Sequence, residues 1–343
     1  RIAPCCHEKT MTRRLDATES GIATAASILR AGGLVAFGTE TVYGLGADAS
    51  QPEAVARIFE AKNRPRFNPL ISHFAHAQAA FAQVVPNPLA LRLAQTFWPG
   101  PLTLILPRAP GCIISDLAAD GLSSLAVRVP ANEVARALLE LVDRPIAAPS
   151  ANRSGRISPV DAAHVLEELD GRIDAVLDSG PCTVGLESTV VDLTDPQNPC
   201  LLRPGGVTLE ELQAICPQIS LPQTTHDVAP HSPGRMISHY APHLPVRLDA
   251  LHVQADEALL AFGAPRATQA PLVWNLSTSG NLEEAAARLF TGLRTLDQEG
   301  QALGLSRIAV QPIPQYGLGR AIQDRLNRAA APRPQNGTQG SIP

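Results

Sequence analysis

The chain has 343 residues, of which 45% are hydrophobic and 17% charged, and its formal net charge is −4. That length is enough for two domains with separate cores, and the apolar content excludes a largely disordered protein. The net negative charge excludes a general attraction to nucleic acid or anionic membranes, so any phosphate site must be a local cluster of cations. No apolar run reaches the roughly 20 residues of a membrane-spanning helix, and we expect a cytoplasmic protein.

Short apolar runs alternate with helical patterns over residues 15–216, which predicts an α/β domain. Asp16 with Glu19 predicts the start of a first helix, and the glycine pair at 32–33 predicts its end. Further strands are predicted at residues 34–37, 70–74, 103–106, 123–129, 174–178, 188–193 and 201–203, and further helices at 52–62, 89–97 and 158–171 and from residue 208.

The segment AKNRPRFNPL at residues 61–70 places cations where a helix must stop, because Pro65 breaks the pattern that begins at Pro52. Lys62 and Arg64 therefore lie at a junction between a helix and a loop. Lys9 and Lys62 are the only lysines among 28 Lys and Arg residues, which favours a specific role for Lys62. A helix C-terminal cation that stabilises the helix dipole is the alternative interpretation.

Other polar residues sit on or just after predicted strands. Alternation in SSLAVRV at 123–129 puts Arg128 on the face opposite the apolar one, as a rigid mount for a cation or as one half of a structural salt bridge. The segment PIAAPSANRSG at 145–155 delivers Ser150 and Asn152 among small neighbours, either toward a ligand or into a polar turn. His73 is a ligand or a structural histidine, and Ser158 a ligand or a helix cap.

The second half of the chain divides into a linker, a small domain and a tail. Residues 217–244 are rich in Pro, His, Ser and Thr, yet SPGRMISHYAP at 232–242 is too particular for a passive spacer. Strand and helix patterns return over 245–331 and predict a small open α/β domain, with a strand at 271–276, a helix from 282, a strand at 307–310 and a helix at 321–330. We expect disorder in an N-terminal extension at 1–14 and in a tail at 332–343.

The candidate site residues are cations and neutral hydrogen-bonding groups on separate loops and strand ends, namely Lys62, Arg64, Arg128, Arg203, Ser150 and Asn152. Four cations and two neutral groups suit a polyphosphate ligand in a chain that has no P-loop motif. Such a set favours transfer at phosphorus, where positioning and charge stabilisation suffice without a protein nucleophile.

The chain resembles the threonylcarbamoyl-AMP synthases that join a YrdC-like catalytic domain, a linker and a second, smaller domain. The resemblance is carried by segments in the family's order: TETVYGLG at 39–46, KNRPRFNPL at 62–70, AVRVP at 126–130, PSAN at 149–152, ESTVVD at 187–192, LRPG at 202–205, SPGRMISHYAP at 232–242, NLS at 275–277 and GLGRAIQDRLNRAA at 317–330. Gly38 stands where the family usually has proline, and the middle of SPGRMISHYAP also departs from the family pattern.

The resemblance implies an α/β (α+β) fold, with a twisted mixed sheet, flanking helices and a concave active site in the first domain and a Rossmann-like second domain. It implies a nucleotidyltransferase that makes threonylcarbamoyl-adenylate and pyrophosphate from L-threonine, bicarbonate or CO2, and ATP, for modification of a tRNA adenosine next to the anticodon. Mg²⁺ is expected with ATP, with its ligands unknown and with no tightly bound organic cofactor. The implied partners are a tRNA threonylcarbamoyl transferase complex that takes the product, and tRNA itself through weak binding; no membrane partner is expected.

The resemblance also implies roles for individual residues. Lys62, Arg64, Ser150 and Asn152 would be catalytic and would hold ATP together with Asn68, Ser124, Ser158, Arg203 and Tyr240. Thr39, His73, Arg128 and Ser188 would surround threonine, with Arg128 pairing its carboxylate. We further hypothesise that the linker is a lid anchored by Tyr240, which admits ATP and keeps water from the adenylate.

Two other functions fit parts of the pattern. Hydrogenase-maturation proteins share the YrdC-like domain and carry out another carbamoyl transfer, but their zinc-finger and acylphosphatase-like segments are not visible in this sequence. A non-catalytic module that binds double-stranded RNA is the alternative from a different class, although a net charge of −4 predicts weak, salt-sensitive binding.

Overall fold

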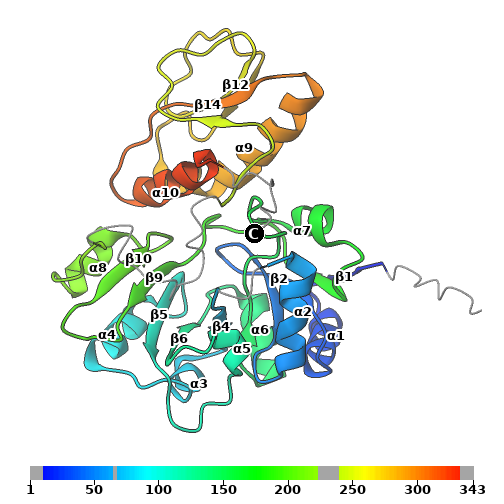
Figure 1. Cartoon of the computed structure of the whole chain (residues 1–343), viewed down its shortest axis with the longest axis vertical. Coiled ribbons are helices and arrows are strands. Elements are labelled where there is room, and N and C mark those ends of the chain that lie inside the picture. The colour runs from blue at the N-terminus through cyan, green and yellow to red at the C-terminus, as the bar shows by residue number, and fades with distance from the viewer. Residues whose placement is uncertain (1–10, 65–67, 223–238, 333–343) are drawn as a thin grey trace, which may run out of the picture.

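The computed structural model describes residues 11–64, 68–222 and 239–332. Figure 1 shows a larger unit built on a wide sheet and a smaller unit that contacts it through α9 and α10. The predicted disorder of residues 1–10 and 333–343, and the first part of the SPGRMISHYAP motif, lie outside the described residues. Over the described ranges, no helix combines the length and apolar character that crossing a membrane requires.

The larger unit contains a ten-stranded mixed sheet in the order β1-β8-β2-β3-β7-β4-β6-β5-β9-β10. Its strands are β1 (Arg13–Asp16), β2 (Val35–Gly38), β3 (Tyr43–Asp48), β4 (Ile71–His73), β5 (Leu102–Pro107), β6 (Ser124–Arg128), β7 (Ile146–Ala147), β8 (Ala175–Asp178), β9 (Thr189–Asp192) and β10 (Cys200–Arg203). The pair β4 and β6 is parallel, whereas β5 and β6 are antiparallel, which confirms the predicted mixed sheet.

The helices of this unit are α1 (Glu19–Arg30), α2 (Pro52–Lys62), α3 (Ala77–Phe81), α4 (Pro88–Phe97), α5 (Asp116–Ala119), α6 (Glu133–Val142), α7 (Ala162–Leu169) and α8 (Leu209–Ile215). Helices α1 and α6 pack on one face of the sheet through Leu29 and Leu138, against Phe37 of β2. Helices α2 and α4 belong to the main core on the other side. As predicted, α2 ends at Lys62, where Asn63 adopts a left-handed conformation with φ of 50°.

The smaller unit has a parallel four-stranded sheet in the order β11-β14-β12-β13. Its elements are β11 (Val246–Arg247), β12 (Glu257–Ala261), β13 (Leu272–Asn275), α9 (Leu282–Ala302), β14 (Arg307–Val310) and α10 (Leu318–Ala330). Helix α9 lies in the crossover from β13 to β14, as parallel strands require. This arrangement confirms the predicted Rossmann-like α/β unit.

Several sequence predictions were wrong at the level of single residues. Arg13–Asp16 is a strand paired in parallel with β8, so the extension predicted to be disordered through residue 14 is ordered from β1 onward. The side chain of Thr18, rather than Asp16, caps α1, and Asp161, rather than Ser158, caps α7. The helix predicted from residue 208 is α8, which Thr208 and Glu211 cap with a capping box. A strand as polar as β1 forms because a distant partner supplies its hydrogen bonds, which local pattern does not show.

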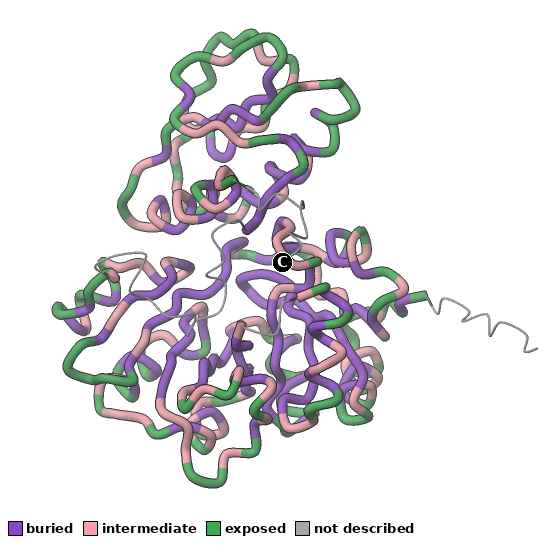
Figure 2. Tube along the Cα trace, viewed as in Figure 1, coloured by how far each residue is buried: buried purple, intermediate pink, exposed green. Residues whose placement is uncertain are grey.

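The two units meet at a junction that contains the end of the predicted linker. The backbone N–H of Ala241 donates to the carbonyl of Gly155 at 3.0 Å, and the N–H of Leu244 donates to the Asp297 carboxylate on α9 at 2.8 Å. Figure 2 shows buried backbone on both sides of this junction. Residues 239–244, apart from the exposed His243, are therefore buried at this junction rather than exposed as a spacer.

Gly185 sets how closely the larger unit approaches α9. Its φ is +74°, and a Cβ added there would lie 2.6 Å from the Cα of Ala287 in α9. Only glycine fits such a contact without moving the helix.

We expect Gly185→Ala to lower the free energy of unfolding by about 2 to 4 kcal/mol, from left-handed strain plus overpacking. Gly111→Ala is the matched control, because Gly111 has φ of +79° but open space around its Cβ position, and it should cost only about 1 kcal/mol. Urea denaturation of both variants measures the difference, and equal losses would contradict a close-packing role for Gly185.

Candidate active site

A small pocket lies where strands of the large sheet face His239 and Tyr240, near the end of the predicted linker. It encloses about 50 Å³ and is lined by residues from β4, β6, β10, the loops around Thr41, Arg64, Ser150 and Glu187, and the His239–Tyr240 pair. Of the predicted site residues, it brings together Arg64, His73, Arg128, Ser150, Ser188, Arg203 and Tyr240. These residues are up to 176 positions apart in the chain (240 − 64), so only the fold unites them.

Lys62 lies next to this pocket, beneath the segment that carries Ser150 and Asn152. Its ammonium donates to the Ser150 carbonyl at 2.5 Å and also to the Asn152 carbonyl. The side chain is buried, and burial together with the nearby Arg64 cation holds the Lys62 pKa well below its ordinary value. Lys62 therefore fixes the backbone of a predicted binding segment and retains one further N–H donor.

Arg64 and Arg203 bring buried positive charge to the pocket. Burial lowers the pKa of Arg64 to about 10 and also lowers the pKa of Arg203. Arg203 donates through Nε and Nη2 to the Ser188 carbonyl at 3.0 and 2.9 Å. The Arg64 Nε is buried without a hydrogen-bond partner among the described residues, although Nη2 donates to the Asn68 carbonyl at 3.4 Å. Such a donor is ready to bind an anion.

Arg128 is paired within the protein, as the salt-bridge interpretation predicted. Its Nη2 donates to Glu40 Oε1 at 2.5 Å, Nη1 to the Thr41 hydroxyl at 2.9 Å, and Nε to the Gly100 carbonyl at 3.2 Å. Both Glu40 and Arg128 are buried, which fixes the guanidinium rigidly at the pocket wall. Sequence reasoning missed Glu40 and Thr41, although both lie inside the quoted TETVYGLG segment.

The predicted threonine-side residues occupy one part of the pocket, with one exception. His73 lies beside Arg128 in the parallel register of β4 and β6, and burial lowers its pKa to about 3, so its imidazole is neutral at pH 7. The Ser188 hydroxyl is 2.7 Å from the Thr103 hydroxyl. Thr39 does not line the pocket; its hydroxyl donates to the Val42 carbonyl at 2.7 Å and shapes the turn that presents Thr41.

The remaining predicted nucleotide residues fall into two groups. Asn68 and Asn152 each have a buried Oδ1 without a hydrogen-bond partner within the described ranges, which suits a ligand-binding amide. Ser158 donates to Glu187 Oε1 at 2.5 Å, so it borders the pocket through Glu187. Ser124 begins β6 opposite Pro107 and is not among the pocket-lining residues.

Glu187 is a pocket residue that sequence reasoning placed in a motif but gave no role. It is 6% exposed, and it accepts from Ser158 and from Arg325 of α10. Burial alone would raise its pKa, but Arg325 and Arg203 lower the Glu187 pKa to about 2. The signal available in the sequence was an acid immediately before a buried strand.

The site does not fit a metal held by the protein. Among the described residues, no group of three or more His, Cys, Asp or Glu side chains could hold a metal ion. The two buried carboxylates of the pocket region are already engaged, Glu40 with Arg128 and Glu187 with Arg325. We therefore derive no step through a protein-bound metal.

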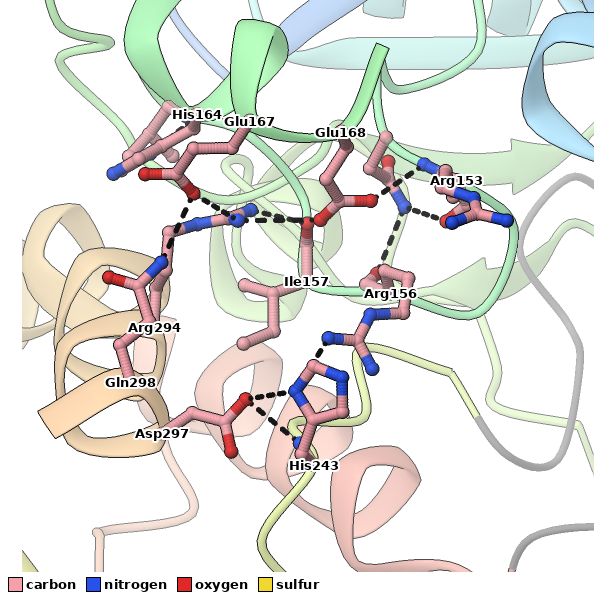
Figure 3. Close-up of polar contacts among 12 residues, drawn as sticks. Arg153, Arg156, Ile157, His164, Glu167, Glu168, His243, Arg294, Asp297 and Gln298 are labelled. Atoms are coloured by element: carbon pink, nitrogen blue, oxygen red, sulfur yellow. Dashed lines mark hydrogen bonds and ion pairs between the residues drawn. The ribbon is translucent and has the colours of Figure 1, made fainter. Parts of the chain in front are cut away.

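A second polar cluster lies behind the binding segment, at the junction with α9 (Figure 3). Arg294 of α9 donates to the Ile157 carbonyl at 3.0 Å and to Glu167 and Glu168 of α7 at 2.9 and 3.3 Å. Glu168 in turn accepts from the backbone N–H of Arg153 at 2.9 Å. A cavity of about 680 Å³ beside this cluster also reaches Lys62. Helix α9 thus supports the turn between Asn152 and Ser158 from outside the pocket.

Comparisons with known proteins match both units. A family model described as "Telomere recombination" matches residues 27–205, and one described as "Threonylcarbamoyl-AMP synthase, C-terminal domain" matches residues 207–331. Threonylcarbamoyl-AMP synthase of Pyrococcus abyssi is 40% identical over 332 residues, covering 91% of this chain and 94% of that protein. The Bacillus subtilis protein of the same name is 39% identical and covers 94% of this chain and 96% of its own length.

A solved structure agrees with these sequence matches. The crystal structure of P. abyssi Sua5 complexed with L-threonine superposes with a TM-score of 0.83 at 39% identity, covering 94% of this chain and 98% of that one.

Buried neutral histidines make stability depend on pH. The pKa values of His73 and His239 are lowered from 6.5 to about 3 by burial, so the unfolded chain binds more protons than the folded one between these values. The free energy of unfolding should therefore fall as pH drops below about 6.5, by about 2 kcal/mol per histidine at pH 5. Urea denaturation at pH 7 and pH 5 measures this loss. His73→Asn should remove the part of this loss that His73 contributes. His252→Asn, at an exposed histidine, should leave the loss unchanged. If the free energy of unfolding of His73→Asn depends on pH as in wild type, the assignment is contradicted.

Proposed function

This chain belongs to the threonylcarbamoyl-AMP synthases, and on that premise we propose that the pocket around Arg64, Arg128 and Arg203 is where L-threonine, bicarbonate and ATP become threonylcarbamoyl-adenylate and pyrophosphate. The activity is that of a nucleotidyltransferase whose product serves threonylcarbamoyl modification of a tRNA adenosine. The observation that supports this pocket most is the convergence of the Arg64, Arg128 and Arg203 guanidinium groups on its wall.

The reaction requires two bond-forming steps. The threonine amine adds to CO2 derived from bicarbonate and loses a proton, which gives a carbamate. One carbamate oxygen then attacks the α-phosphorus of ATP, and the bond to pyrophosphate breaks with its electron pair on the leaving group. Negative charge grows on the phosphoryl oxygens, so fixed cations stabilise the transition state more than the bound substrates.

In our assignment Arg64 and Arg203 are the cations that stabilise this negative charge. Lys62 holds the Ser150–Asn152 segment in place, and Lys62 and this segment together contact the phosphates. Their donors are buried and preorganised, so they need little rearrangement during the reaction. The nucleotide is held further by Asn68, Ser124, Ser158 and Tyr240, of which only Tyr240 lines the pocket described above.

Threonine occupies the part of the pocket bordered by His73, Arg128 and Ser188, with Thr39 supporting the turn above it. Arg128 binds the amino acid carboxylate while Glu40 keeps the guanidinium in a fixed plane. A neutral His73 avoids adding another positive charge beside the threonine amine, which must lose its own proton to react.

The His239–Tyr240 pair acts as a lid. A pocket of about 50 Å³ is far too small for ATP, so groups that line it must move for the nucleotide to enter. Tyr240 is placed to close the pocket because it lines the pocket near the end of the predicted linker and stacks its ring on Phe290 with centroids 5.4 Å apart. Closure then keeps water from the labile adenylate.

The remaining participants come with the substrates or receive the product. Mg²⁺ enters on the ATP phosphates, since the protein offers no ligand cluster for it in the described residues. The unstable product passes to a tRNA threonylcarbamoyl transferase complex in the cytoplasm. Lys62, Arg128 and Arg203 are buried, so they do not form the surface patch that a double-stranded RNA-binding module needs.

Pyrophosphate release tests the reaction. We expect ATP with bicarbonate to give pyrophosphate in the presence of L-threonine, much less with L-serine and none without an amino acid. Lys62→Ala should reduce the rate about a hundredfold, because the segment that binds the phosphates loses its support. Arg266→Ala, which removes an exposed cation of the smaller unit, is the control and should behave as wild type. Release that is indifferent to threonine would overturn the proposal.

Tyr240 variants test the lid. Tyr240→Ala should weaken ATP binding and accelerate hydrolysis of the adenylate, because both the ring and the closure are lost. Tyr240→Phe keeps the stacking on Phe290 and should retain protection of the adenylate. Radiolabelled product decay and ATP titration measure the two effects, and a Tyr240→Ala protein that matches wild type in both would rule out the lid.

A further inference from the structure

Arg325 of α10 is the largest fully buried side chain of the described chain, and it reaches from the smaller unit into the larger one. Its Nε donates to Glu187 Oε2 at 2.8 Å, and its Nη1 donates to the Pro204 carbonyl at 2.9 Å and to Asp324 at 2.7 Å. Burial alone would lower its pKa, but the surrounding negative groups raise the Arg325 pKa above its ordinary value. A guanidinium with no exposure is retained at high desolvation cost.

Glu187 links Arg325 to Ser158, a residue assigned to the nucleotide side of the pocket. Glu187 accepts the Ser158 hydroxyl proton on Oε1 while Arg325 occupies Oε2. Because the Ser158 hydroxyl donates to Glu187, its oxygen can meet a further group only as an acceptor. In the proposed function, a contact between Ser158 and the nucleotide would therefore be made to a hydroxyl or amino group rather than to a phosphate oxygen.

The same guanidinium also contacts Tyr240. The Arg325 Cζ lies 5.5 Å from the centre of the Tyr240 ring, which also stacks on Phe290 of α9 and meets the His239 ring edge-on. Arg325 thus contacts the Glu187 carboxylate, which orients Ser158, and the Tyr240 ring, which closes the pocket. Glu187 belongs to the larger unit, and Tyr240 belongs to the linker. No other described arginine of α10 makes both contacts, because Arg320 and Arg328 pair with Glu210 and Asp324.

We propose that Arg325 is a positioning residue for the nucleotide: the smaller unit completes the ATP site by holding Glu187 and Tyr240, and through Glu187 it orients the Ser158 hydroxyl. The inference rests on the proposed function of the pocket, and it gives α10 a part in substrate binding. The competing explanation is a purely structural ion pair, which would affect stability alone.

The first experiment compares ATP and L-threonine dissociation constants in wild type and Arg325→Met. We expect the ATP dissociation constant to rise about ten- to a hundredfold, as for the loss of a hydrogen bond to a charged group, and the threonine constant to change far less. Arg320→Gln is the matched control, because it removes a partly exposed ion pair between the same helix and Glu210, and it should leave both constants unchanged.

A neutralised pair separates positioning from stability. Arg325→Met alone leaves Glu187 buried and uncompensated, so its melting temperature should fall, whereas Arg325→Met with Glu187→Leu removes both charges and should recover it. If Arg325 positions the nucleotide, ATP binding stays weak in the recovered double variant. If ATP binding returns together with stability, the pair is only structural and the inference is overturned.

A third comparison decides the matter even if the double variant remains unstable. Ser158→Ala should weaken ATP binding in wild type but add nothing in the Arg325→Met protein, because the hydroxyl is no longer oriented there. Additive effects of the two substitutions would contradict the inference. Failure of the proposed function looks different: wild type itself would then bind no ATP or release no threonine-dependent pyrophosphate.

Discussion

The pocket depends on compensating several buried cations that lie close together. An unpaired buried charge costs several kcal/mol, so each cation must find an anion or a set of carbonyl dipoles. Arg128 has Glu40, Lys62 has the carbonyls of Ser150 and Asn152, and Arg203 has the carbonyl of Ser188. Compensation by carbonyls leaves net positive charge in place, which an anionic substrate can then neutralise.

This constraint links the larger unit to the smaller one. Glu187 is an anion at the edge of a cationic pocket, and its partner Arg325 arrives from the smaller unit. Arg294 makes a parallel contribution from α9 by supporting the turn between Asn152 and Ser158. Arg294 contacts Ile157 directly, and Arg325 is linked to the neighbouring Ser158 through Glu187. The interface between the units is therefore continuous with the site rather than remote from it.

Local sequence patterns predicted the helices and strands that are specified by residues close together in the chain. The end of α2 at Lys62 followed from a proline, and the alternation in β6 correctly put Leu125 and Val127 in the main core, with Ala126 facing the other way. Helix α6 and the strands β3, β11 and β12 were not predicted. Strands such as β1 and β11 are too short or too polar to be recognised without their partners, since their stability comes from pairing with distant residues.

The sequence alone determined the family, the order of the motifs and the residue types of the site, because these depend on residues close together in the chain. Tertiary structure alone decided which charges are paired, and with what. Glu40 and Arg128 are 88 positions apart, and Glu187 and Arg325 are 138 apart. Hydrogen-bond partners at such separations follow from how the sheets and helices pack, and burial then sets the pKa values of the groups they bring together.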